Sequence, residues 1–420
     1  MPAIQFIGLV LILIYPILAL TVHYAGDGLF ACIFILSLIY IYFERQYLKS
    51  IFNHIPWWAF GICFIHPAII IIQSILNHHW YSAGFDAPAR LMLAPFVLLF
   101  LASLKSEHLK YFYITSALGC LCTLLLVGSQ FDGERAQVVL LGGSYSLLSP
   151  TRLGYFILNF GIFSLALWTG DRLKKTLAVL GVASSLLISY LTLTRGAWLS
   201  IIGIILFLII YFNKDSLQKM ILKIGLIFLA GFALFSFNAA THERIALAYK
   251  EFKTPTNLQS EDASSVGHRK QLYAVTTLMI MQHPLLGVGR DNFQDSYNKT
   301  IQNNSRFDYE KFGPEPHTHP HNESLYAWSE LGFFGFIGLV LLYLGPGWFF
   351  WKNRLSKNPD IRVASVIGMM MVIHYVISGL PDIVIIFNVL KTSLYSMSII
   401  VPMAIILSIK NNKKLNINKN

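Results

Sequence analysis

Residues 319–335 read His-Pro-His-Asn-Glu-Ser-Leu-Tyr-Ala-Trp-Ser-Glu-Leu-Gly-Phe-Phe-Gly and contain a histidine, His321, that is suited to proton transfer. His321 follows a proline at the point where a polar segment gives way to an apolar run that is expected to form a helix. Glu323 in the first turn is typical of a helix start, and the positive end of such a helix disfavours a protonated imidazole. A neutral imidazole is what a general base needs near neutral pH. Two roles therefore fit His321: a general base, or a loop residue that caps the helix.

Arginines gather where apolar runs meet the loops on one side of the chain's expected helices. They are Arg90, Arg135, Arg152, Arg195 and Arg269. A guanidinium presents its donors in a planar fork that fits phosphate oxygens, so several arginines around one cavity would bind a pyrophosphate. The alternative is that they reach lipid headgroups or pair with acidic residues such as Asp86 or Asp382. We favour the alternative for Arg152, whereas Arg195 has no acidic neighbour in its short turn and favours a functional role.

Other patterns in the sequence give weaker signals for metal, nucleotide or thiol chemistry. His317, His319 and His321 alternate, which could indicate a metal site, but no thiolate accompanies them. Gly287-Val288-Gly289 is too short for a nucleotide-binding loop. We therefore expect a reaction without metal, nucleotide or other cofactor, in which the substrate itself carries the energy. Two further histidines lie in apolar runs and are expected to be hydrogen-bonded packing residues: His66 and His374.

The elements that must position these residues are predicted to be membrane-spanning helices. The chain has 420 residues, of which 55% are hydrophobic and only 13% charged, and its mean hydropathy is +0.58. The apolar residues fall in continuous blocks of roughly 17 to 25, the length that crosses a bilayer as a helix. The fold class is therefore all-α integral membrane with about twelve spans. We expect them near 4–22, 28–43, 57–76, 90–104, 110–128, 153–169, 175–193, 197–213, 219–238, 324–350, 361–380 and 389–409.

The chain is expected to form a single polytopic domain, 1–420, with one large external insertion between the ninth and tenth spans, about 239–323. Its apolar spacing predicts one helix over 241–252 and a second over 270–281. The Pro and Gly residues that follow should end the second helix, and residues 291–318 are expected to be irregular.

Lysine and arginine place the loops on two sides of the membrane. They are concentrated in loops such as 172–175 and 352–362 and in the C-terminal tail, which predicts cytoplasmic termini and an external insertion. The formal net charge of +11 is mostly this topology signal and does not indicate nucleic-acid binding. The basic tail would also attract anionic membrane lipid.

Four short blocks resemble motifs of the O-antigen ligase and O-antigen polymerase superfamily of bacterial envelopes. They are His321-Asn322 followed by nine residues, Gly332, two residues and Gly335; Thr194-Arg195-Gly196-Ala197; Ser265-Val266-Gly267-His268-Arg269; and Gly379-Leu380-Pro381-Asp382-Ile383. The first block is the most specific of the four. In the last block Pro381 stands where the family pattern has a serine, which puts the role of Asp382 in question.

The resemblance implies a fold of the glycosyltransferase C type in the bacterial inner membrane, with the active site on the periplasmic side. It implies an inverting transfer of O-antigen polysaccharide en bloc from undecaprenyl pyrophosphate to the lipid A–core oligosaccharide. By residue match, His321 takes the role of general base, and Arg195 and Arg269 that of pyrophosphate binders. The further candidates are Arg90, Arg135, Asp382 and Asn322.

Three other functions remain open at this point. A pilin-type protein O-oligosaccharyltransferase shares the His-Asn block, and an O-antigen polymerase belongs to the same superfamily. A lipid-linked glycan flippase or transporter could also place arginines in a cavity, although it would show paired broken helices in its two halves. The oligomeric state has no signal in the sequence.

Overall fold

The described part of the chain is almost entirely helical. The structure is a computed structural model that describes residues 2–45, 52, 55–133, 136–142, 147–212, 265–305, 307 and 318–417. In these ranges the only paired strands are β1 (Val138–Val139) and β2 (Leu147–Leu148), which form a short antiparallel hairpin. The predicted all-α membrane fold is therefore confirmed.

The helices follow the apolar blocks of the sequence. They are α1 (Pro2–Leu18), α2 (Ala25–Phe43), α4 (Trp58–Leu76), α5 (Ser82–Ser103), α6 (Ser106–Leu109), α7 (Tyr111–Gln130), α8 (Pro150–Ser164), the 3-10 helix η1 (Leu165–Thr169), α9 (Arg172–Leu191), α10 (Arg195–Phe212), α13 (Ser265–Gln282), α14 (Phe293–Gln302), α16 (Glu323–Asn353), α17 (Pro359–Ser378) and α18 (Val389–Ile417). Ten helical segments of the described ranges are long and apolar enough to cross a membrane, and α1 is a shorter apolar helix. Eleven of the twelve predicted spans thus have a helical counterpart. The remaining predicted span, the ninth (219–238), lies outside the described residues, as does the helix predicted over 241–252.

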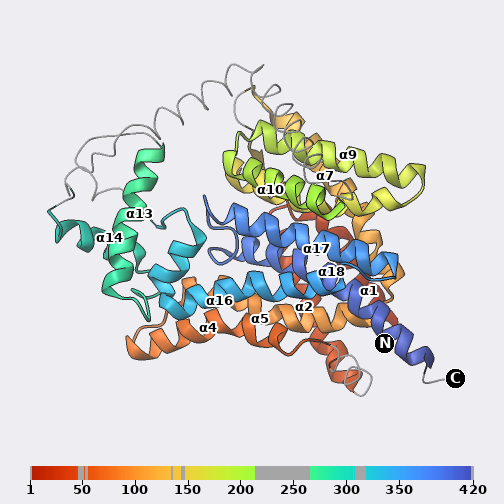
Figure 1. Cartoon of the computed structure of the whole chain (residues 1–420), viewed down its shortest axis with the longest axis horizontal. Coiled ribbons are helices and arrows are strands. Elements are labelled where there is room, and N and C mark those ends of the chain that lie inside the picture. Colours follow the sequence, from red (N-terminus) through yellow and green to blue (C-terminus); the bar gives the residue numbers. More distant parts are fainter. Residues whose placement is uncertain are drawn as a thin grey trace.

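The bundle is organised around α18, whose spanning part is almost completely enclosed by other helices. It packs against α5, α17 and α2, while α16 packs between α4 and α17. Helices α7, α8 and α9 form a neighbouring layer, and α13 and α14 lie at the far end of the molecule from the two chain termini (Figure 1). Helix α13 contacts α16 and so helps to join this outlying pair to the bundle.

Two histidines inside the bundle have packing roles, as predicted. The Nε2 atom of His66 on α4 is 2.9 Å from the carbonyl oxygen of Gly335 on α16. The Nδ1 atom of His374 on α17 is 2.8 Å from the hydroxyl of Ser200 on α10. Both side chains are buried, and each ties one helix to the next rather than facing a cavity.

Helix α14 corrects the expectation that residues 291–318 are irregular. Phe293, Tyr297 and Ile301 recur at spacing four and are all buried, and they pack with residues of α13 such as Val275. Exposed polar residues such as Asp295 and Lys299 lie between them, so the sequence of this stretch resembles that of a loop. The prediction of α13 is confirmed, because that helix ends at Gln282, directly before His283-Pro284.

A break in α16 receives the loop that connects α13 to α14. Gly332 has a φ of 68° and a ψ of −167°, which interrupts the helix inside the bundle. Such a positive φ suits glycine, and a Cβ there would collide with the backbone of Leu285. The loop then pairs with the opened helix, since the N–H of Val288 donates to the carbonyl of Ser329 at 2.8 Å. The backbone conformation at position 332 therefore explains why this position of the His-Asn block is a glycine.

Candidate active site

His321 lies immediately before α16 with its side chain partly open to the surroundings. Its backbone has a φ of 51°, and 41% of the side chain is exposed. The N-cap of α16 is Asn322, whose Oδ1 accepts from the N–H of Leu325 at 2.9 Å and whose Nδ2 donates to the carbonyl of Leu380 at 2.8 Å. The alternative in which His321 caps the helix is therefore wrong, because the next residue does so and leaves the imidazole available.

Asp382 faces His321 from the loop between α17 and α18. Its Oδ1 is 3.9 Å from Nδ1 of His321, and only 12% of its side chain is exposed. Burial alone would raise the pKa of this carboxyl, but the neighbouring His321 and the Lys391 ammonium lower it to about 2. Asp382 is thus a carboxylate at neutral pH. Pro381 in the place of the family's serine does not move it away from the histidine.

A second histidine supports the first without sharing its exposure. The ring of His319 is edge-on to that of His321, with centroids 4.3 Å apart, and edge-on to Phe387 at 4.7 Å. Its Nδ1 accepts from the backbone N–H of His321 at 3.3 Å. Burial and the nearby His321 lower the pKa of His319 to about 3, so its ring is neutral near pH 7. His319 therefore fixes the backbone of His321 and is not itself suited to accept a proton near neutral pH.

The turn that carries Arg195 packs against the loop that carries Asp382. Arg195 is the first residue of α10, and a Cβ on the next residue, Gly196, would meet the Tyr155 hydroxyl and lie 2.7 Å from the Pro381 ring. A side chain at position 196 would require Tyr155 and Pro381 to shift. The sequence-predicted turn and the Pro381-Asp382 segment thus come together, although they are far apart in the chain.

Helix α13 brings Arg269 to the same end of the bundle. Arg269 interacts electrostatically with Tyr273, one turn further along, and with Tyr155 of α8. The hydroxyl of Tyr273 donates to the carbonyl of His321 at 3.3 Å and lies 3.5 Å from that of Leu380. The helix of Arg269 is therefore anchored on the backbone beside the candidate base.

The remaining predicted arginines are placed differently. Arg90 lies within α5 rather than at its boundary, because the helix begins at Ser82, and it forms an ion pair with Asp86 at 3.5 Å. Arg135 lies outside the described residues, as does His317. Arg152 interacts electrostatically with Lys391, another cation at this end of the bundle.

Glu323 holds the loop that carries Asp382 through hydrogen bonds to its backbone, a role that the sequence did not reveal. Its buried carboxylate accepts backbone N–H bonds from Val384 at 2.6 Å, from Ile385 at 3.0 and 3.1 Å, and from Ile386 at 2.9 Å. Its own N–H donates to the carbonyl of Gly379 at 2.8 Å. An acidic residue at a helix start is a common sequence feature, so this inward-facing role could not be distinguished from ordinary capping.

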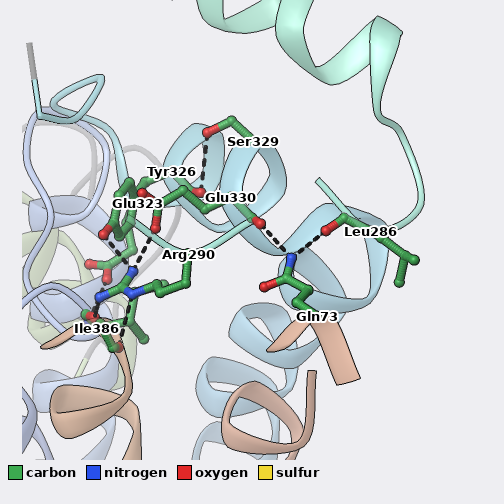
Figure 2. Close-up of polar contacts among 9 residues, drawn as sticks. Gln73, Leu286, Arg290, Glu323, Tyr326, Ser329, Glu330 and Ile386 are labelled. Atoms are coloured by element: carbon green, nitrogen blue, oxygen red, sulfur yellow. Dashed lines mark hydrogen bonds and ion pairs between the residues drawn. The ribbon is translucent and has the colours of Figure 1, made fainter. Parts of the chain in front are cut away.

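Two buried cations were also missed. Lys391 lies in the first turn of α18, donates to the carbonyl of Ile383 and interacts electrostatically with Asp382. Arg290 follows the Gly287-Val288-Gly289 turn and is enclosed by α5, α16 and the Ile386 loop (Figure 2). The sequence signal for Lys391 is a lysine inside an apolar span, and the signal for Arg290 is an arginine next to a pair of glycines.

The arrangement can accept a proton and stabilise an anion at neighbouring positions. The exposed imidazole is backed by a carboxylate, which favours the imidazolium that forms when a proton arrives. The turn that carries Arg195 contacts Pro381, and the helix that carries Arg269 contacts the His321 carbonyl through Tyr273. Base and cations are what displacement of a phosphorylated leaving group by a hydroxyl requires.

Comparisons with known proteins agree with this chemistry. Residues 180–340 match the family described as O-antigen ligase, and this region contains Arg195, Arg269 and His321. A protein of Haemophilus influenzae described as uncharacterized is 24% identical over 331 residues, which are 74% of this chain and 77% of that protein. The match supports the predicted resemblance to the O-antigen ligase superfamily, and the ten long apolar helices of the described residues are those of a multi-pass membrane protein.

Proposed function

We propose that this protein is an O-antigen ligase of the bacterial inner membrane. It transfers a preassembled O-antigen polysaccharide from undecaprenyl pyrophosphate to a sugar hydroxyl of lipid A–core. The observation that carries the proposal is the His321–Asp382 pair, which the Arg195 turn approaches through Pro381 and the Arg269 helix approaches through Tyr273. The family match over residues 180–340 supports the same assignment.

His321 is the general base in this proposal. Nδ1 pairs with Asp382, so we assign Nε2 to the acceptor hydroxyl. As the hydroxyl oxygen attacks the anomeric carbon, its proton passes to Nε2 and the bond from that carbon to the pyrophosphate oxygen breaks. Direct displacement of this kind inverts the anomeric centre. General-base help of this type contributes about 10²–10⁴-fold to the rate.

Arg195 and Arg269 bind the pyrophosphate and stabilise it as it leaves. Fixed cations in a site with little water often supply the larger part of the rate enhancement. The leaving group is already activated, so the reaction needs neither a nucleotide nor a metal ion. Asp382 keeps the imidazolium stable until its proton is released.

The site belongs on the periplasmic face in this proposal. Both chain termini lie toward one end of the molecule, and α13 and α14, which are part of the 239–323 insertion, lie toward the other (Figure 1). With the basic loops and tail in the cytoplasm, the insertion and His321 face the periplasm. Lipid A–core and the lipid-linked glycan both reach the protein on that side.

The test is transfer by the purified protein from a defined undecaprenyl-pyrophosphate glycan to lipid A–core, followed on a gel, without ATP and with a chelator present. The expected product is capped lipopolysaccharide. A gene deletion should leave uncapped lipopolysaccharide and accumulated lipid-linked polymer. Capped lipopolysaccharide in the deletion strain, or a strict requirement for a divalent metal, contradicts the proposal. Glycan lengthening without capping would assign the chain to the polymerases.

A further inference from the structure

Arg290 is a fully buried arginine whose guanidinium contacts three other segments of the chain. Its Nε donates to the carbonyl of Gly84 at 2.9 Å, its Nη1 to the carboxylate of Glu330 at 2.8 Å and to the Tyr326 hydroxyl, and its Nη2 to the carbonyl of Ile386 at 3.0 Å (Figure 2). Both members of the Arg290–Glu330 pair are only 2% exposed. Burial disfavours the charge, but Tyr326 and Glu330 outweigh it and raise the pKa of Arg290, so the cation persists.

The contact with Ile386 connects Arg290 to the candidate active site. The N–H of Ile386 donates to Glu323 at 2.9 Å, and its carbonyl accepts from Arg290 at 3.0 Å. The same peptide segment is thus held through its N–H by one charged group and through its carbonyl by another. This segment follows directly on Asp382, so its position determines where the carboxylate meets His321.

Arg290 also lies in the connection between the helix of Arg269 and the bundle. The loop that ends at Arg290 docks on the break in α16, where Gln73 of α4 donates to the carbonyls of Leu286 at 2.5 Å and Glu330 at 2.7 Å. One guanidinium therefore ties the α13–α14 unit, α5, α16 and the Asp382 loop to a common point.

We propose that Arg290 is a positioning residue for transfer, which sets the Asp382 loop against His321 and fixes both relative to the helix that carries Arg269. The inference rests on the proposed function of the site. The fork of an arginine is needed because Gly84, Glu330 and Ile386 lie in different directions, and a single ammonium cannot satisfy all three.

The variant that separates positioning from stability removes both buried charges. Arg290→Met alone leaves Glu330 buried and unpaired, which strongly destabilises a protein. The double variant Arg290→Met/Glu330→Leu leaves no unpaired charge, and such replacements are often neutral for folding. It still lacks the contact with the Ile386 carbonyl. Arg172→Met, an exposed arginine on α9, is the matched control.

The readouts are membrane abundance, the thermal midpoint in detergent, and kcat across pH. The double variant should regain the abundance and midpoint of wild type but keep a kcat at least about tenfold lower, since small misplacements of reacting groups are costly. The acidic limb of its pH–rate profile should move toward lower pH, because an anion near an imidazole favours the protonated form. Other charged and titratable groups surround the His321–Asp382 pair, and none of them is changed in these variants. They are His319, Glu323, Lys391, Tyr155, Tyr273 and Arg269.

Arg290→Lys carries the test if the double variant does not insert, because it keeps the charge opposite Glu330 but cannot reach the Gly84 and Ile386 carbonyls together. It should lower kcat at least about fivefold with an acidic limb shifted in the same direction. A folded variant with the wild-type kcat and pH profile would overturn the inference and leave Arg290 with a purely structural role. Failure of wild type to transfer would instead refute the proposed function.

Discussion

Replacing Glu323 by glutamine should release the loop that holds Asp382. In wild type one carboxylate oxygen accepts from Val384 and Ile385 and the other from Ile385 and Ile386. The glutamine side chain has an amide NH2 in place of one carboxylate oxygen, and this group would face a backbone N–H whichever way the amide is turned. At least one buried backbone donor then loses its acceptor, which costs about 1–3 kcal/mol of stability. The remaining bonds lose their charge assistance, at about 1 kcal/mol each. The total destabilisation is about 3–5 kcal/mol.

The loss should appear both in stability and in catalysis. Thermal unfolding in detergent should shift down by several degrees, and transfer to lipid A–core should fall at least about tenfold as Asp382 leaves its position. Glu107→Gln is the control, because Glu107 is exposed on α6 and its replacement should change stability by no more than about 0.5 kcal/mol. A Glu323→Gln protein with the wild-type melting midpoint and activity would refute the claim that this carboxylate holds the loop.

Three further predictions address the groups around His321. Arg195→Lys keeps the positive charge but loses the planar guanidinium, so transfer should fall severely while membrane abundance stays normal. Near-normal activity would show that Arg195 contributes only its charge. Asp382→Asn should lower kcat and move the acidic limb of the pH–rate profile to lower pH; an unmoved limb would separate Asp382 from the base. Since the folded pKa of Asp382 is about 2, below its ordinary value, the stability it contributes in wild type should persist at neutral and mildly acidic pH and be lost only as the pH falls toward 2, measured as thermal midpoint against pH.

The membrane fold could be predicted well because its signal is local. A run of apolar residues long enough to cross a bilayer has few alternatives to a helix, and eleven of the twelve predicted spans have counterparts. The errors arose where the pattern was weaker. Helix α5 begins at Ser82 although Gly84 and Pro88 lie in its first turns, and α14 buries a narrow stripe within a polar stretch.

The site could be predicted only in part. His321 and Asp382 were named from short motifs, and the structure places them opposite each other. Glu323 and Arg290 were not assigned site roles, because a buried charge is recognised by its partners, and those partners come from distant segments. Nothing in the neighbourhood of Arg290 in the sequence indicates that it will meet the Ile386 carbonyl, which lies 96 positions further along the chain.

The most direct test of the account is the rate of glycan transfer by His321→Ala in the purified system, measured together with binding of the undecaprenyl-pyrophosphate donor. The account predicts that the rate falls by about 10²-fold or more, that the acidic limb of the pH–rate profile flattens, and that donor binding survives because the arginines are untouched. A variant that ligates within a fewfold of wild type would contradict the account and remove His321 from the mechanism.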